Sequence, residues 1–190
     1  MLQPNPDAEK HEGPLRKALS LIRASATDRA RGGKLSTGEL AQLRRPDDGG
    51  VGSPALWRVL AELFPKELHE NWIRDRLPDW SCALAAFAEL AQESSGRPMP
   101  LGEALGMSDF SEMRLLRLLR APTPELYREV RGAAHFLAQK GVPADPLELG
   151  RLVIGEPGQQ AQQLRRRIAQ SYYRALHKKP DATHASPKES

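Results

Sequence analysis

The spacing of the apolar residues limits the fold of this chain more than any other feature of its sequence. Leu15, Leu19 and Ile22 recur every three or four residues, and Leu164 and Ile168 repeat the pattern near the other end. Runs in which β-branched and polar residues alternate are absent, and valine and isoleucine are sparse. Because helices and strands have different periods, this pattern predicts an all-α fold, a compact multi-helix bundle with no sheet of note.

Capping and breaking residues indicate where these helices begin and end. Ser36 and Glu39 form a capping box that opens one helix, and Ser53 followed by Pro54 opens the next. A D-x-x-E pattern that starts at Asp109 is expected to cap a later helix. The expected helices cover residues 14–26, 36–45, 53–63, 66–75, 78–91, 101–106, 113–121, 124–140, 145–155 and 157–176.

Three regions are expected along the chain. Residues 1–13 are predicted to be a flexible N-terminal tail, residues 14–177 a single all-helical domain, and residues 178–190 a disordered tail. The turn-rich stretch ESSGRPMP predicts a seam near residues 94–100 between two helical halves. No apolar run approaches the roughly 20 residues of a membrane span, and there is no signal-peptide core, so we expect a cytoplasmic protein without a membrane partner.

Positive charge is concentrated in the second half of the chain. The net charge of the whole chain is only +4. Residues 1–110 hold 14 basic and 16 acidic residues, a net of −2, whereas residues 111–190 hold 14 basic and 8 acidic residues, a net of +6. Such an asymmetry favours a polyanionic partner.

The segment MRLLRLLRA places arginine at every third position, with leucine pairs between. Because each helical residue turns by about 100°, the leucines fall on one side of the helix and Arg114, Arg117 and Arg120 on the other. The leucine side must be buried, so the arginine side faces either water or an anion. Glu112 is the only acid near that face, so pairing within the helix cannot neutralise it.

Further basic residues recur in small groups along the chain. They are Arg29, Arg31 and Lys34 in a loop, Arg44 and Arg45, Arg128 and Arg131, and Arg165, Arg166 and Arg167. Any single one of these is most simply a solvated side chain on a helix face. Taken together, uncompensated arginines of one sign on several helices favour contact with a phosphate backbone. Aromatic residues make up only 5% of the chain, so base stacking of the single-strand type is not expected.

Catalysis and cofactor binding find little support in the sequence. The stretch RGGKLS lacks the spacing of a phosphate-binding loop, and no nucleophile motif is present. The five histidines form no H-x-x-x-H pair, and the single cysteine, Cys82, excludes an internal disulfide and a multi-cysteine metal site. We therefore expect no enzyme activity, no cofactor and no metal.

Two other functions stay open at this point. The segments TGELAQL and SPALWRVL are a candidate helix-turn-helix, which would make the chain a stand-alone helical DNA-binding regulator. Its connection, residues 46–53, is longer than usual, and its second helix carries a single arginine, Arg58. The chain could also be a pure protein–protein scaffold whose arginines are solvated or meet acidic partners.

The order of several short motifs resembles a known family. ELAQLRRP, LWRVL, MPLGEALG, EMRLLRLLRAPTPE and LELGRLV follow one another and precede a basic final helix with YY. Over about residues 14–176 this order is similar to the CasB-type small subunit of the type I-E CRISPR surveillance complex, Cascade. The pieces most like the family are LRR at residues 43–45 and RLLRA at residues 117–121.

The resemblance implies a non-catalytic, all-helical subunit that acts in antiviral DNA interference. Two copies would lie side by side in the complex, against its backbone subunits and its large subunit. Guide RNA pairing would supply sequence recognition, while this subunit's basic surface would steady the guide–target hybrid and the displaced non-target DNA strand. By motif, the residues carried over are Arg44 and Arg45, then Arg114, Arg117 and Arg120.

Overall fold

Ten α-helices make up the regular structure of the part of the chain that the computed structural model describes, residues 6–27, 33–45, 51–68, 71–91, 97–155 and 158–178. No strand occurs within these residues, which confirms the predicted all-α fold. The helices are α1 (Pro6–Thr27), α2 (Thr37–Arg44), α3 (Pro54–Leu63), α4 (Asn71–Asp75), α5 (Leu77–Leu90), α6 (Leu101–Met107), α7 (Glu112–Arg120), α8 (Glu125–Gln139), α9 (Pro146–Ile154) and α10 (Gln159–Lys178).

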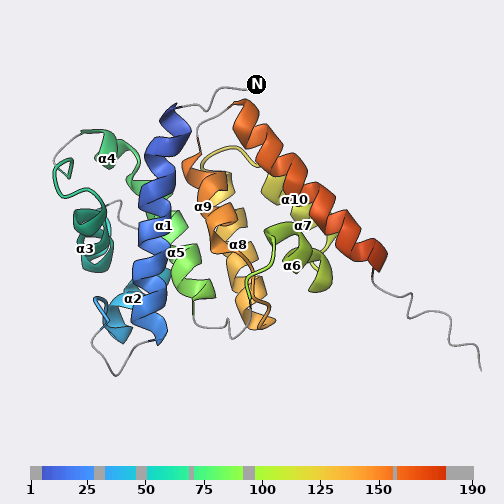
Figure 1. Cartoon of the computed structure of the whole chain (residues 1–190), viewed down its shortest axis with the longest axis horizontal. Coiled ribbons are helices and arrows are strands. Elements are labelled where there is room, and N and C mark those ends of the chain that lie inside the picture. Colours follow the sequence, from blue (N-terminus) through green and yellow to red (C-terminus); the bar gives the residue numbers. More distant parts are fainter. Residues whose placement is uncertain are drawn as a thin grey trace, which may run out of the picture.

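Helix α5 stands at the centre of the fold and contributes to two groups of buried side chains. Its Trp80 and Phe87 pack with α1 to α4, whereas its Cys82 and Ala86 pack with α6 to α10. Figure 1 shows α3 and α4 at one end of the molecule and α10 at the other, with α1, α5, α8 and α9 between them. Helix α9 also contributes to both groups, with Leu147 in the first and Leu149 in the second, so the two groups are continuous across α5 and α9. The predicted seam near residues 94–100 stays a prediction.

The helix starts follow the predicted caps in two cases and differ in a third. Ser36 and Glu39 form the complete capping box of α2, and the Ser53 hydroxyl accepts a hydrogen bond from the Leu56 N–H at the start of α3. The predicted cap at Asp109 is wrong. Ser111 caps α7 instead, because its backbone is extended, whereas Asp109 has a φ of 61° and turns the chain.

The first helix begins earlier than predicted. Residues 6–13, expected to belong to a flexible tail, are the first turns of α1. The apolar stripe of this helix starts only at Leu15, so its polar beginning left no periodic signal. One contact that ties this end down is Glu12, whose carboxylate accepts hydrogen bonds from Arg151 Nε at 2.9 Å and Nη2 at 2.6 Å.

Two other helices also differ in length from the expectation. Within the predicted helix 66–75, residues 66–68 form a turn and Asn71–Asp75 is helical, and α10 continues to Lys178 rather than ending at residue 176. Leu164, Ile168 and Tyr172 form the buried stripe of α10, as their spacing predicts. None of the described helices is both long enough and apolar enough to span a membrane.

Candidate nucleic-acid interface

Helix α7 separates leucine from arginine as its sequence predicts. Leu115 and Leu118 are fully buried, whereas Arg114, Arg117 and Arg120 are all exposed. Across the described part of the chain, no ion pair involves any of these three arginines. The helix therefore buries its leucine side and presents to solvent three guanidinium groups that have no carboxylate partner among the described residues.

An aromatic ring joins α7 to its neighbour α8. The Arg114 guanidinium lies 6.0 Å from the centre of the Phe136 ring, and Lys140 Nζ lies 5.8 Å from the same centre. Phe136 also packs edge-on against Phe110. A ring face attracts cations, so Phe136 holds two basic side chains close together. Sequence reasoning had singled out Arg114 but missed Lys140.

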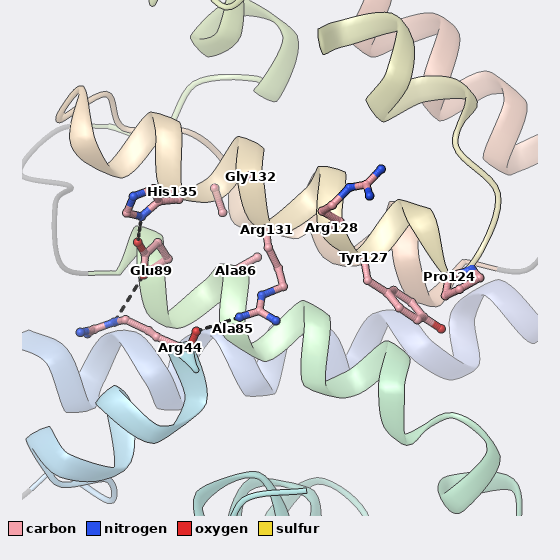
Figure 2. Close-up of a pocket in the computed structure, with 11 residues that line it drawn as sticks. Arg44, Ala85, Ala86, Glu89, Pro124, Tyr127, Arg128, Arg131, Gly132 and His135 are labelled. Carbon is pink, nitrogen blue, oxygen red and sulfur yellow. Dashed lines mark hydrogen bonds and ion pairs between the residues drawn. The ribbon is translucent and has the colours of Figure 1, made fainter. Parts of the chain in front are cut away.

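An open groove of about 590 Å³ lies between the end of α2, helix α5 and helix α8. Arg44 comes from α2, and Arg128 and Arg131 come from α8, more than 80 residues later in the chain (Figure 2). Small residues of α5, Ala85 and Ala86, also line it. The structure thus brings three of the predicted basic residues together at one hollow.

Two of the groove arginines are held in place by backbone carbonyls. Arg131 Nη2 donates a hydrogen bond to the Arg44 carbonyl oxygen at 3.1 Å. Arg44 Nε donates to the Ala88 carbonyl oxygen at 3.1 Å and lies 3.8 Å from a Glu89 carboxylate oxygen. These contacts fix α2 against α5 and α8. A guanidinium has five N–H donors, so the single hydrogen bond from Arg131 to the Arg44 carbonyl leaves other donors of Arg131 able to meet an anion.

A histidine that sequence reasoning left aside lines the same groove. His135 Nδ1 is 2.6 Å from a Glu89 carboxylate oxygen, and His135 Nε2 is 2.9 Å from Gln139 Nε2 (Figure 2). Its spacing from Arg128 is seven residues, two helical turns, so both share one face of α8. That spacing was the signal that could have added His135 to the predicted set.

The other end of the groove includes Tyr127, whose hydroxyl is engaged in a hydrogen bond within the protein. The Tyr127 hydroxyl donates a hydrogen bond to an Asp79 carboxylate oxygen at 2.6 Å. Burial, and then this bond, raise the pKa of the Tyr127 phenol, so it stays protonated. Burial likewise raises the pKa of the nearby Cys82 thiol to about 12, which makes it an unreactive core residue.

The remaining predicted basic residues do not line this groove. Lys34 forms an exposed ion pair with Glu62 at 2.8 Å, and its hydrogen bond lowers the pKa of that carboxyl. Arg45 lines a separate hollow of about 240 Å³ beside α3. Arg165 and Arg166 lie on α10, where the next residue, Arg167, pairs with Glu148. Arg29 and Arg31 lie outside the described residues.

The described residues also bear on metal binding. No group of three histidine, cysteine, aspartate or glutamate side chains that could hold a metal ion occurs among them. What the geometry offers is cationic: an exposed arginine face on α7, and next to it a groove whose lining includes three arginines, one histidine and one acid. Such a surface can bind a polyanion through charge and hydrogen bonds.

Comparison with known proteins gives a family. No curated protein and no solved structure matched the chain. A family model did match: CRISPR-associated protein Cse2, over residues 39–173. This range covers well over half of the 190 residues and includes α7, α8 and the whole groove. The protein therefore belongs to the Cse2 family, the CasB-type small subunits of the type I-E Cascade complex.

Proposed function

We propose that this Cascade subunit is non-catalytic and uses its basic surface to hold nucleic-acid backbones during antiviral DNA interference in the cytoplasm. In this proposal two copies lie beside the backbone subunits and the large subunit of the complex. Guide RNA pairing supplies the sequence recognition, and the pair steadies the guide RNA–target DNA hybrid and the displaced non-target strand. The family match supports membership in the complex, and the charge distribution supports the contact with nucleic acid.

The observation that carries the proposal is the arginine face of α7. Arg114, Arg117 and Arg120 are exposed, and no ion pair within the described residues neutralises them. Elsewhere in the described chain, Lys34, Arg151 and Arg167 each meet a carboxylate. Guanidinium groups match the geometry of phosphate oxygens, so an unneutralised row of them suits a sugar–phosphate backbone.

The groove between α2, α5 and α8 adds further basic residues on the helix that neighbours α7. Helix α7 packs on α8, so Arg128 and Arg131 stand on the helix next to the arginine face. Contacts of this kind position a strand without reading its bases. Each contact can be weak, because an assembled complex holds the strand at a high effective concentration.

The test is binding of the purified full chain to labelled DNA of unrelated sequence, single- and double-stranded, across a salt series. We expect weak, sequence-independent binding that falls steeply with salt. Changing Arg114, Arg117 and Arg120 to glutamate should reduce the salt slope of log K by about two units for single-stranded and nearly three for double-stranded DNA, since three phosphate contacts are lost.

A matched control changes the charge equally without touching α7. Lys66, Arg74 and Arg97 are exposed, and no ion pair within the described residues involves them. Their triple change to glutamate should lower affinity only through the net charge. If both triple variants bind alike, or if the wild-type chain binds no DNA even at low salt, a protein–protein scaffold becomes the better account.

The regulator alternative gains nothing from the geometry. Arg58, the single arginine of its would-be recognition helix, forms an ion pair with Glu39 of α2. A stand-alone regulator would bind one operator sequence far more tightly than unrelated DNA. The same binding assay, run with competitor DNA of varied sequence, separates the two functions.

A further inference from the structure

We propose that the sugar–phosphate backbone of one nucleic-acid strand crosses helix α8 directly over Gly132, in the groove beside α5. This inference rests on the proposed nucleic-acid function and adds the place and the closeness of the contact. Its basis is a glycine that the fold itself does not need.

Gly132 stands near the middle of α8, is exposed and lines the groove (Figure 2). A Cβ atom built at this position would have no other atom within 4 Å, apart from its immediate chain neighbours and its own helix backbone. Its backbone is helical, so no left-handed conformation demands glycine either. A glycine in the middle of a helix is less stable than alanine, so the fold by itself would favour alanine here.

Several other glycines of the described residues are explained by the fold, whereas Gly13 in α1 and Gly38 in α2 share with Gly132 a helical backbone and no tight contact for an added Cβ. At Gly106 an added Cβ would lie 2.8 Å from the Tyr172 carbonyl oxygen, and at Gly150 it would lie 2.8 Å from the Phe87 ring. Gly141 has a positive φ of 64°. Gly132 has none of these reasons. Unlike Gly13 and Gly38, it lines the groove, so its missing side chain leaves room there for something that approaches the helix from outside.

The surroundings of Gly132 indicate what approaches. Arg128 lies one helical turn before it and His135 almost one turn after it, so the three form one exposed stripe. Arg131 stands beside the stripe and reaches toward α5 (Figure 2). Among the described residues that line the groove Glu89 is the one acid, and a Glu129 carboxylate oxygen lies 3.4 Å from Arg128 Nη2 on the exposed side of α8. A stripe with Arg128 at one end, a histidine at the other, a gap at its middle and Arg131 beside it fits a chain of phosphates, which would touch the helix backbone at the gap and donor side chains on either side.

The test compares three glycine variants of the full chain for thermal stability and for binding of single-stranded DNA of unrelated sequence at low salt. Gly132→Ala should raise Tm by about 2 °C, because alanine favours the helix, and should weaken binding at least about threefold. Gly132→Leu should weaken binding further.

Gly38→Ala is the matched control. Gly38 is exposed in α2, does not line the groove, and has only the Ser36 hydroxyl oxygen near an added Cβ, at 3.9 Å. This variant should bind as the wild-type chain does. A gain in stability together with a loss of binding at Gly132 alone is a result that a purely structural glycine cannot produce.

Three outcomes overturn the inference. One is wild-type binding by both Gly132 variants, and another is a Gly132→Ala chain less stable than wild type, which would assign the glycine to the fold. The third is displacement by polyglutamate but not by unlabelled DNA, which would assign the groove to an acidic peptide. If the α7 reversals still abolish binding while the Gly132 variants bind normally, the proposed function stands and only this crossing point fails.

Discussion

Among the described residues that line the groove, one carboxylate, that of Glu89, stands with three arginines and a histidine. Glu89 lies 2.6 Å from His135 and 3.8 Å from Arg44, so it occupies a place among the groove's cations that a phosphate oxygen could take. Both of its oxygens are acceptors, as are those of a phosphate. Glu89 thus both holds these side chains in position and reduces their attraction for an incoming anion.

Replacing Glu89 with glutamine should therefore tighten DNA binding. Removing the negative charge of the partly exposed Glu89 should improve the binding free energy by up to about 1 kcal/mol. The affinity for DNA should then rise by about two- to fivefold at low salt. The measurement is a binding titration of the variant against wild type. Glu67→Gln, which removes a carboxylate that does not line the groove, is the control, and equal gains in the two variants would contradict the role given to Glu89.

The contact between Glu12 and Arg151 gives the start of α1 a pH dependence. The hydrogen bond from Arg151 lowers the folded-state pKa of Glu12 below that of an ordinary glutamate, about 4.5. A lowered pKa stabilises the fold above the unfolded-state value, and this stabilisation is lost as pH falls through the folded-state value. Glu12→Gln should cost about 1–2 kcal/mol at pH 7 and progressively less below pH 4.5. Urea unfolding of the variant and the wild-type chain at pH 7 and below pH 4.5 measures the difference in unfolding free energy. A difference that does not change with pH would contradict this role of Glu12.

Helix α6 lies so close to α10 that backbone meets backbone. An added Cβ at Gly102 would clash with the Ile168 carbonyl oxygen and the Ser171 hydroxyl. Glu148 of α9 joins both helices, since it accepts the Leu101 N–H at 2.7 Å and pairs with Arg167 of α10 at 3.1 Å. The backbones of α6 and α10 are therefore in close contact, and the Glu148 carboxylate links the two helices.

Gly102→Ala should accordingly destabilise the fold, whereas the same change to alanine at Gly132 should stabilise it. Forcing a methyl group into this contact should cost about 2 kcal/mol or more, because the nearest atom is backbone and cannot rotate away. Denaturant unfolding of the variant beside Gly38→Ala provides the comparison. Equal stability of the two variants would show that α6 and α10 can separate more easily than their geometry implies.

At the level of helices, much of this fold could be predicted from sequence. The leucine face of α7 and the stripe of α10 follow from periodicity alone, because burial imposes it. The ends were harder. Asp109 and Ser111 are both good caps two positions apart, and only the backbone conformation decides between them. The first turns of α1 were missed because an ion pair with a distant helix, rather than local pattern, helps to hold them.

The candidate site was predictable in its parts but not in its assembly. Arg44 and Arg131 were both singled out from sequence, yet their contact depends on how α2, α5 and α8 pack. Nothing in either segment encodes that neighbour. Gly132 and His135 lie on the same helix as Arg128, so helical spacing could have found them once the groove was suspected.

For the whole molecule, the layout of charge matters more than its total. Residues 1–110 are net negative by two and residues 111–190 net positive by six, and several cations of the described chain, such as Lys34 and Arg58, are neutralised by carboxylates. A molecule charged in this way has an electric dipole. In the field of a polyanion it would turn before it touches, presenting α7 and α8 first. The association rate constant, and not only the affinity, would then depend on the position of the arginines of α7.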